Sequence, residues 1–143
     1  MESDFTLGHF ARGVILIAAT VALQLVAQIT LFRTVKASWI HRGTPTMQET
    51  MMVLVAVLVL MAGMILQVAA WGLLYYLWGE LGSYANCLYF SFASYTTVGA
   101  ADLKLSRPHR MLGALESAVG VMMLGWSTAL LVQIINRARR NAT

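Results

Sequence analysis

The sequence predicts an all-α membrane protein with three transmembrane helices and one short helix that enters the membrane without crossing it. Of its 143 residues, 59% are hydrophobic and 11% are charged, whereas a soluble domain carries about a quarter charged residues. Three apolar runs are each long enough to cross a bilayer, because about 20 helical residues span its hydrocarbon core. A further aromatic segment is too short to do so. A chain of this length cannot bury so much apolar surface in its own core, so we expect a lipid bilayer as partner.

The remaining composition argues against several other classes of protein. The net charge is +4, but the basic residues flank the apolar runs, where membrane topology places them, so we expect no nucleic-acid partner. The single cysteine, Cys87, is expected to be a packing residue. His9, His41 and His109 are too far apart to suggest a metal site. We therefore expect no enzyme activity, no catalytic residue, no cofactor and no small-molecule substrate.

The first 49 residues are expected to form a transmembrane helix over residues 13–32 and a basic cytoplasmic connector. Glu2 and Asp4 make the N-terminus acidic, which disfavours a signal peptide and favours a retained helix. Pro45 indicates a break before the next helix. Gln24 and Gln28 share one face of the first helix, where they are expected to form interhelical hydrogen bonds.

The second apolar run, residues 50–78, is longer than a crossing requires and ends in four aromatic residues that suggest an interfacial belt: Trp71, Tyr75, Tyr76 and Trp78. Glu80 and Gly82 then close it. Residues 83–86 resemble a helix start, and the aromatic segment 88–95 fits a re-entrant helix. The stretch that follows is not helical in pattern. Such backbone is tolerated at membrane depth only where protein buries it or water lines it.

Pro108 is expected in the first turn of the last helix, which covers about residues 109–136 and is followed by a basic tail, residues 137–143. The connector and this tail are both basic, so both are expected in the cytoplasm. That orientation places the N-terminus and the re-entrant segment outside a plasma membrane, which we take to be of bacterial (cell inner membrane) type. The expected orientation also places three basic residues on the outer side, against the positive-inside rule: Lys104, Arg107 and Arg110.

The region from residue 50 to 136 resembles the two-helix pore module of the bacterial potassium channel family. The resemblance rests on Tyr89-Phe90-Ser91 as the start of a pore helix, the Thr97-Val98-Gly99-Ala100-Ala101 filter, Asp102-Leu103, Arg110 and Gly120. The first helix lies outside the resemblance. Family membership would imply a passive, potassium-selective cation channel in which carbonyl rings from four copies replace the hydration shell of the ion, and therefore a homotetramer.

The resemblance also implies roles for individual residues. Thr97, Val98, Gly99, Ala100 and Ala101 would form the filter, with K⁺ or another monovalent cation bound at the first three. Gly120 would be a hinge in the last helix, or alternatively a site of close helix packing. The expected filter supports are Thr96, Asp102, Glu116, Ser94 and Tyr95, and the expected cavity lining, for which plain helix packing is the alternative, is Val121, Leu124, Thr128 and Val132.

Glu116 lies inside the last apolar run, and a carboxyl group within a membrane is by default a candidate functional residue. We expect it behind the filter, hydrogen-bonded to a pore-helix hydroxyl such as that of Ser94, Tyr95 or Thr96. A role in gating, in proton sensing or as a proton pathway is the alternative.

The filter departs from the family pattern Thr-Val-Gly-Tyr-Gly-Asp at two positions. Ala100 lacks the aromatic ring that braces the filter, and Ala101 replaces a glycine that has positive φ in the family. A non-glycine residue there costs about 1–2 kcal/mol per chain. The outer half of the filter is therefore expected to be rearranged, so that selectivity is relaxed. The alternative is a non-conducting scaffold or accessory membrane subunit.

Overall fold

The computed structural model describes residues 7–38 and 45–142, and its regular elements are all helical. Three of its helices contain windows long and apolar enough to cross a membrane, at Gly13–Thr30, Thr50–Leu77 and Arg110–Asn136. The predicted fold class, with three spanning helices and a short re-entrant one, is confirmed. The elements are α1 (Leu7–Ser38), α2 (Pro45–Leu77), α3 (Tyr84–Tyr95), the 3₁₀ turn η1 (Arg107–His109) and α4 (Arg110–Ala142).

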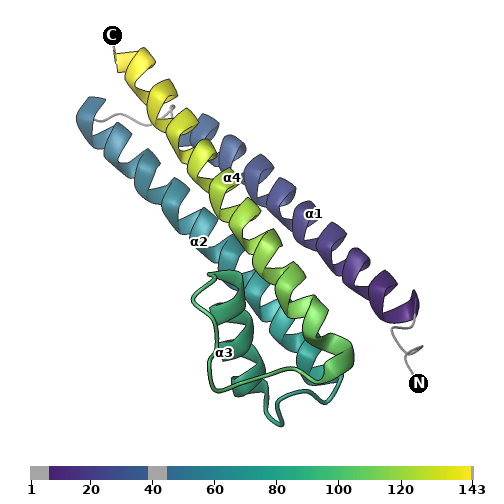
Figure 1. The fold of residues 1–143 in the computed structure, drawn as a ribbon. Helices are drawn as coiled ribbons and strands as arrows, with labels where there is room; N and C mark the ends of the chain where they lie inside the picture. The colour runs from purple at the N-terminus through teal and green to yellow at the C-terminus, as the bar shows by residue number, and fades with distance from the viewer. Residues whose placement is uncertain (1–6, 39–44, 143) are drawn as a thin grey trace.

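The three long helices run side by side, and α3 lies against one end of the bundle (Figure 1). The start of α1, the end of α2 and the start of α4 lie at the end that carries α3. The end of α1, the start of α2 and the end of α4 lie at the opposite end. Consecutive helices are therefore antiparallel, as three successive membrane crossings require.

Several helix boundaries differ from the predicted ones. Helix α1 continues to Ser38, so the first part of the expected connector is helical. Helix α2 begins at Pro45, where a proline costs no hydrogen bond because the first helical N–H has no partner inside the helix. Helix α4 continues to Ala142, into the expected tail. The rest of the connector, residues 39–44, lies outside the described residues.

The re-entrant helix α3 is capped as the sequence suggested. Ser83 is extended (φ −137°), and its hydroxyl accepts a hydrogen bond of 3.2 Å from the backbone N–H of Asn86. Such a cap satisfies a free N–H group of the first turn. The helix begins at Tyr84, earlier than the Tyr89 start that the family resemblance implied.

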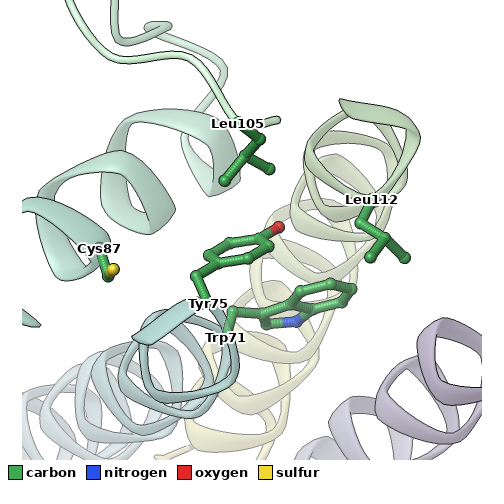
Figure 2. Close-up of a cluster of buried hydrophobic side chains, with 5 residues drawn as sticks. All are labelled: Trp71, Tyr75, Cys87, Leu105 and Leu112. Atoms are coloured by element: carbon green, nitrogen blue, oxygen red, sulfur yellow. The ribbon is translucent and has the colours of Figure 1, made fainter. Parts of the chain in front are cut away.

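The end of α2 is joined to α3 and α4 by a buried cluster of Trp71, Tyr75, Cys87, Leu105 and Leu112 (Figure 2). The Tyr75 and Phe90 rings pack in a T-shaped pair with a centroid distance of 5.6 Å. Trp71 and Tyr75 are fully buried, so their predicted place in an interfacial belt is wrong. Cys87 is buried, as predicted, and its thiol donates to the carbonyl of Glu80 at 3.1 Å.

Candidate functional site: the segment after the re-entrant helix

The end of α3 turns sharply into the predicted filter. Thr97 has φ +62°, a left-handed conformation that usually falls to glycine after a helix, and its N–H donates to the carbonyl of Ser94 at 3.0 Å. Gly99 has φ +79°, and its N–H donates to the carbonyl of Ala93 at 3.0 Å. These two hydrogen bonds fold the filter segment, residues 97–99, back over the last turn of α3.

The filter segment has almost no packing partners within its own chain. Val98 is 82% exposed, although it is apolar, and Thr97 and Gly99 are also exposed. Asp102 is exposed and makes no hydrogen bond or ion pair within the described part of the chain. Two backbone hydrogen bonds thus hold the filter segment to α3, while its side chains are exposed.

The backbone strain expected at Ala101 does not occur in this conformation. Across residues 7–38 and 45–142, the non-glycine residues with positive φ are Leu81 and Thr97. The left-handed positions of the segment fall at Thr97 and Gly99. Ala101 therefore does not adopt the positive φ that the resemblance implies for this position, and the rearrangement of the outer half of the filter stays a prediction.

Tyr95, directly before the filter, is held at both its ring and its backbone. The ring is 1% exposed, and its hydroxyl donates a hydrogen bond of 2.5 Å to Oε1 of Gln67 on α2. On the backbone side, a Cβ placed on Gly120 would lie 2.1 Å from the carbonyl oxygen of Tyr95. Only a glycine lets α4 approach α3 so closely. Gly120 is therefore a packing residue. Helix α4 is continuous through this position, and the hinge role of Gly120 stays a prediction.

Glu116 is fully buried behind α3 and links three helices. Its carboxyl group accepts from the Tyr75 hydroxyl at 2.8 Å and lies 2.5 Å from the Ser91 hydroxyl. The expectation of a pore-helix hydroxyl was therefore right, but the residue is Ser91. Two of the three hydroxyls that the sequence analysis proposed as partners of Glu116 have other acceptors. The Tyr95 hydroxyl donates to Gln67, and the Thr96 hydroxyl donates to the carbonyl of Phe92.

The Ser91 hydroxyl has two oxygen neighbours but only one proton. It lies 2.9 Å from the carbonyl of Val68 and 2.5 Å from Glu116. All three oxygens are satisfied together when Ser91 donates to Val68 and Glu116 donates its own proton to Ser91. Tyr75 then donates to the second carboxyl oxygen. This arrangement requires a neutral carboxylic acid at Glu116.

A second polar cluster ties the end of α2 to the loop after the filter, and sequence reasoning did not find it. Glu80 accepts from the backbone N–H of Ser106 at 2.9 Å and from the Ser106 hydroxyl, and its Oε1 lies 2.6 Å from Nδ1 of His109. Trp78 stacks on the His109 ring at 4.7 Å. Burial acts to raise the pKa of Glu80, but the hydrogen bonds from Ser106 and His109 outweigh it and lower that pKa below its ordinary value.

The predicted cavity-lining residues follow one exposed stripe of α4: Val121, Leu124, Thr128 and Val132. The opposite stripe of α4 is packed within the chain, through Leu112, Glu116, Val119, Met123 and Ile134. The same chain therefore does not cover the predicted lining.

Gln67 is the main site residue that the sequence did not reveal. It is a lone amide in the apolar run of α2 and is 1% exposed. An isolated polar residue in such a run was the available signal, because buried amides in membranes need partners. Its partner could not be identified before α3 was placed.

Comparison with known proteins identifies a family for most of the pore region. The sequence model of a family described as "Ion channel" matches residues 54–137, more than half of the chain, from α2 through the filter segment to α4. No curated protein and no solved structure matches the chain.

Proposed function

The chain belongs to the ion channel family, and on that premise we propose that it forms a passive pore for monovalent cations, with potassium as its first substrate and with relaxed selectivity. The observation that carries the proposal is the filter segment, Thr97–Gly99, which is anchored at its base and 82% exposed at Val98. An apolar side chain and free carbonyl groups at membrane depth need protein or water around them. Further copies of the chain would supply both.

A ring of copies is the arrangement that such a segment needs. Cation filters of this type use backbone carbonyls from four chains to replace the hydration shell of the ion. A single filter segment offers one carbonyl per level and cannot surround an ion. We therefore propose a homotetramer in which Thr97, Val98 and Gly99 contribute carbonyl groups around a shared axis.

The exposed faces of α2 and α4 differ in a way that supports contact between copies. The exposed residues of α2 include bulky apolar side chains such as Leu58, Met61 and Ile65, which suit lipid. Helix α4 instead exposes small and polar residues among its apolar ones, including Ala118, Gly125, Thr128, Ala129 and Gln133. Small and polar residues in membrane helices favour protein contact or water. We place this face of α4 toward the axis and toward neighbouring copies.

The proposed location is a plasma membrane with the filter outside. The antiparallel order puts the start of α1 on the filter side and the end of α4 on the other side. Basic residues near both the end of α1 and the end of α4 favour a cytoplasmic position for that side.

Flux into liposomes tests the proposal. Vesicles containing the purified protein should take up K⁺ faster than empty vesicles, and Na⁺ to a lesser degree. Gly99→Ala and Thr97→Ala should reduce the K⁺ flux, because both residues shape the filter segment. If K⁺, Na⁺ and H⁺ enter no faster than in empty vesicles, the channel proposal fails.

Ala100 and Ala101, which depart from the family filter pattern, favour a second candidate function. In it, the protein is a non-conducting scaffold or accessory subunit that keeps the pore fold. Restoring the family pattern with Ala100→Tyr and Ala101→Gly separates the two. In a working but altered filter, the double variant should raise the ratio of K⁺ to Na⁺ flux. If the wild type conducts and the double variant has the same ratio of K⁺ to Na⁺ flux, these two positions do not set the selectivity. If only the double variant conducts, the wild type is a scaffold.

A further inference from the structure

Helix α1 lies outside the matched region, residues 54–137, yet a buried chain of hydrogen bonds joins it to the base of the filter. The Tyr95 hydroxyl donates to Oε1 of Gln67 at 2.5 Å. Nε2 of Gln67 donates to Oε1 of Gln24 on α1 at 2.9 Å. The chain ends on α4, where Nε2 of Gln24 donates to the Ser127 hydroxyl at 3.0 Å.

The links from Tyr95 to Gln67 and from Gln67 to Gln24 are buried, the link to Ser127 is partly buried, and all three run in one direction. Tyr95, Gln67 and Gln24 are between 1% and 3% exposed. Each amide accepts through its oxygen and donates through its nitrogen, so turning one amide over alone would place like atoms of Gln67 and Gln24 against each other and break the hydrogen bond between them. A buried polar group without its partner is costly, so the chain holds its members in one arrangement.

The position of Tyr95 makes this chain relevant to the filter. Thr96 and Thr97 follow it directly, and its backbone already touches Gly120. The hydroxyl contact with Gln67 therefore fixes the ring of the residue from which the filter segment departs. Gln67 in turn has its amide oriented by Gln24.

Helix α1 is itself held in register by a second contact. Nε1 of Trp71 donates to the Thr20 hydroxyl at 3.2 Å, and that hydroxyl donates to the carbonyl of Leu16 at 2.9 Å. Thr20 lies one turn before Gln24 on the same face. Two neighbouring turns of α1 thus form hydrogen bonds with α2, and these bonds fix the position of α1 along the α2 axis.

We infer that α1 positions the filter, with Gln24 and Gln67 acting as positioning residues that orient Tyr95. The inference deepens the proposed function, and its flux readout depends on that function. A second readout, the amide chemical shifts of Val98 and Gly99 in lipid, does not depend on conduction.

Gln24→Met tests the inference, with Gln28→Met as the matched control. Methionine keeps the length of the side chain and removes the amide. Gln28 lies one turn further along α1, and its buried Oε1 has no hydrogen-bond partner among the described residues. Gln24→Met should shift the Val98 and Gly99 amide signals and change the K⁺ to Na⁺ flux ratio by about fivefold or more, the size of effect that a lost buried hydrogen bond can have on an equilibrium. Gln28→Met should change neither.

Tyr95→Phe provides the second arm, because it removes only the hydroxyl at the filter end of the chain. It should reproduce the effect of Gln24→Met, and the double variant should show no larger effect than either single one. If Gln24→Met fails to assemble, the comparison of Tyr95→Phe with Gln28→Met decides in its place.

Two results would overturn the inference. The first is that Gln24→Met and Gln28→Met behave alike, and the second is that the effects of Gln24→Met and Tyr95→Phe add in full. If wild-type vesicles carry no cation flux, the proposed function fails, and the amide shifts still decide whether α1 orients the filter.

Discussion

Replacing Gly120 by alanine should push α4 away from the base of the filter. The added Cβ would lie 2.1 Å from the carbonyl oxygen of Tyr95 and 2.8 Å from its carbonyl carbon. A carbon atom ordinarily stays about 3.3 Å from such an oxygen, so the two helices must separate by roughly 1 Å. The obstructing atoms belong to the backbone at the end of α3 and cannot rotate away.

The expected loss of stability follows from two opposing terms. Overpacking of this kind costs about 1–3 kcal/mol, and a backbone neighbour argues for the upper end. Alanine offsets about 1 kcal/mol of that through its better helix propensity. The net effect of Gly120→Ala on the free energy of unfolding is thus a loss of about 1–2 kcal/mol.

Gly125 on the same helix provides the control. A Cβ there would meet no atom within 4 Å in the same chain, so Gly125→Ala should leave the stability of the dissociated single chain unchanged or raise it by up to about 1 kcal/mol. Thermal unfolding of single chains in a detergent that separates the copies, followed by tryptophan fluorescence, compares the two variants. A Gly120→Ala protein as stable as Gly125→Ala would refute the close approach of α4 to Tyr95.

Three further predictions concern buried carboxyl groups. Glu116→Gln should cost less than about 1 kcal/mol, because an amide can accept from Tyr75 and donate to Ser91, whereas Glu116→Ala should cost about 2–4 kcal/mol in the same unfolding assay. The infrared C=O stretch of a protonated carboxyl group should be present in the wild type and absent from Glu116→Gln; its presence in both would rule out the neutral acid. The lowered pKa of Glu80 means that its contribution to stability is complete above its ordinary pKa of about 4.3 and is lost as the pH falls through the lower value. The stability difference between wild type and Glu80→Gln should therefore shrink below about pH 4, and a constant difference would contradict the hydrogen bonds from Ser106 and His109.

The elements that the sequence predicted well carry local signals. Ser83 before an aromatic segment marked the start of α3, and Pro108 marked the turn into the last helix. The length of each apolar run reported a spanning helix because bilayer thickness sets that length. Glu116 could be recognised as buried because a lone carboxyl group in a membrane helix must find a partner.

The features that escaped prediction are contacts between distant parts of the chain. Ser91 and Ser94 both lie on the short α3, and only the rotation of that helix decides which of them meets Glu116. Trp71 looked interfacial by composition but faces inward, because α3 and α4 cover the end of α2. Gln24 was expected to bond another helix, yet its partner Gln67 depends on the register of α1 against α2.

In the proposed pore, the filter segment, Thr97–Gly99, surrounds an axis shared by copies of the chain. A cryo-electron microscopy map of the purified protein in lipid nanodiscs with K⁺ would show this arrangement. We expect fourfold symmetry, the α4 stripe of Val121 and Thr128 facing the axis, and ion density beside the carbonyls of the filter segment. A particle without fourfold symmetry, or a filter segment that faces lipid, would contradict it.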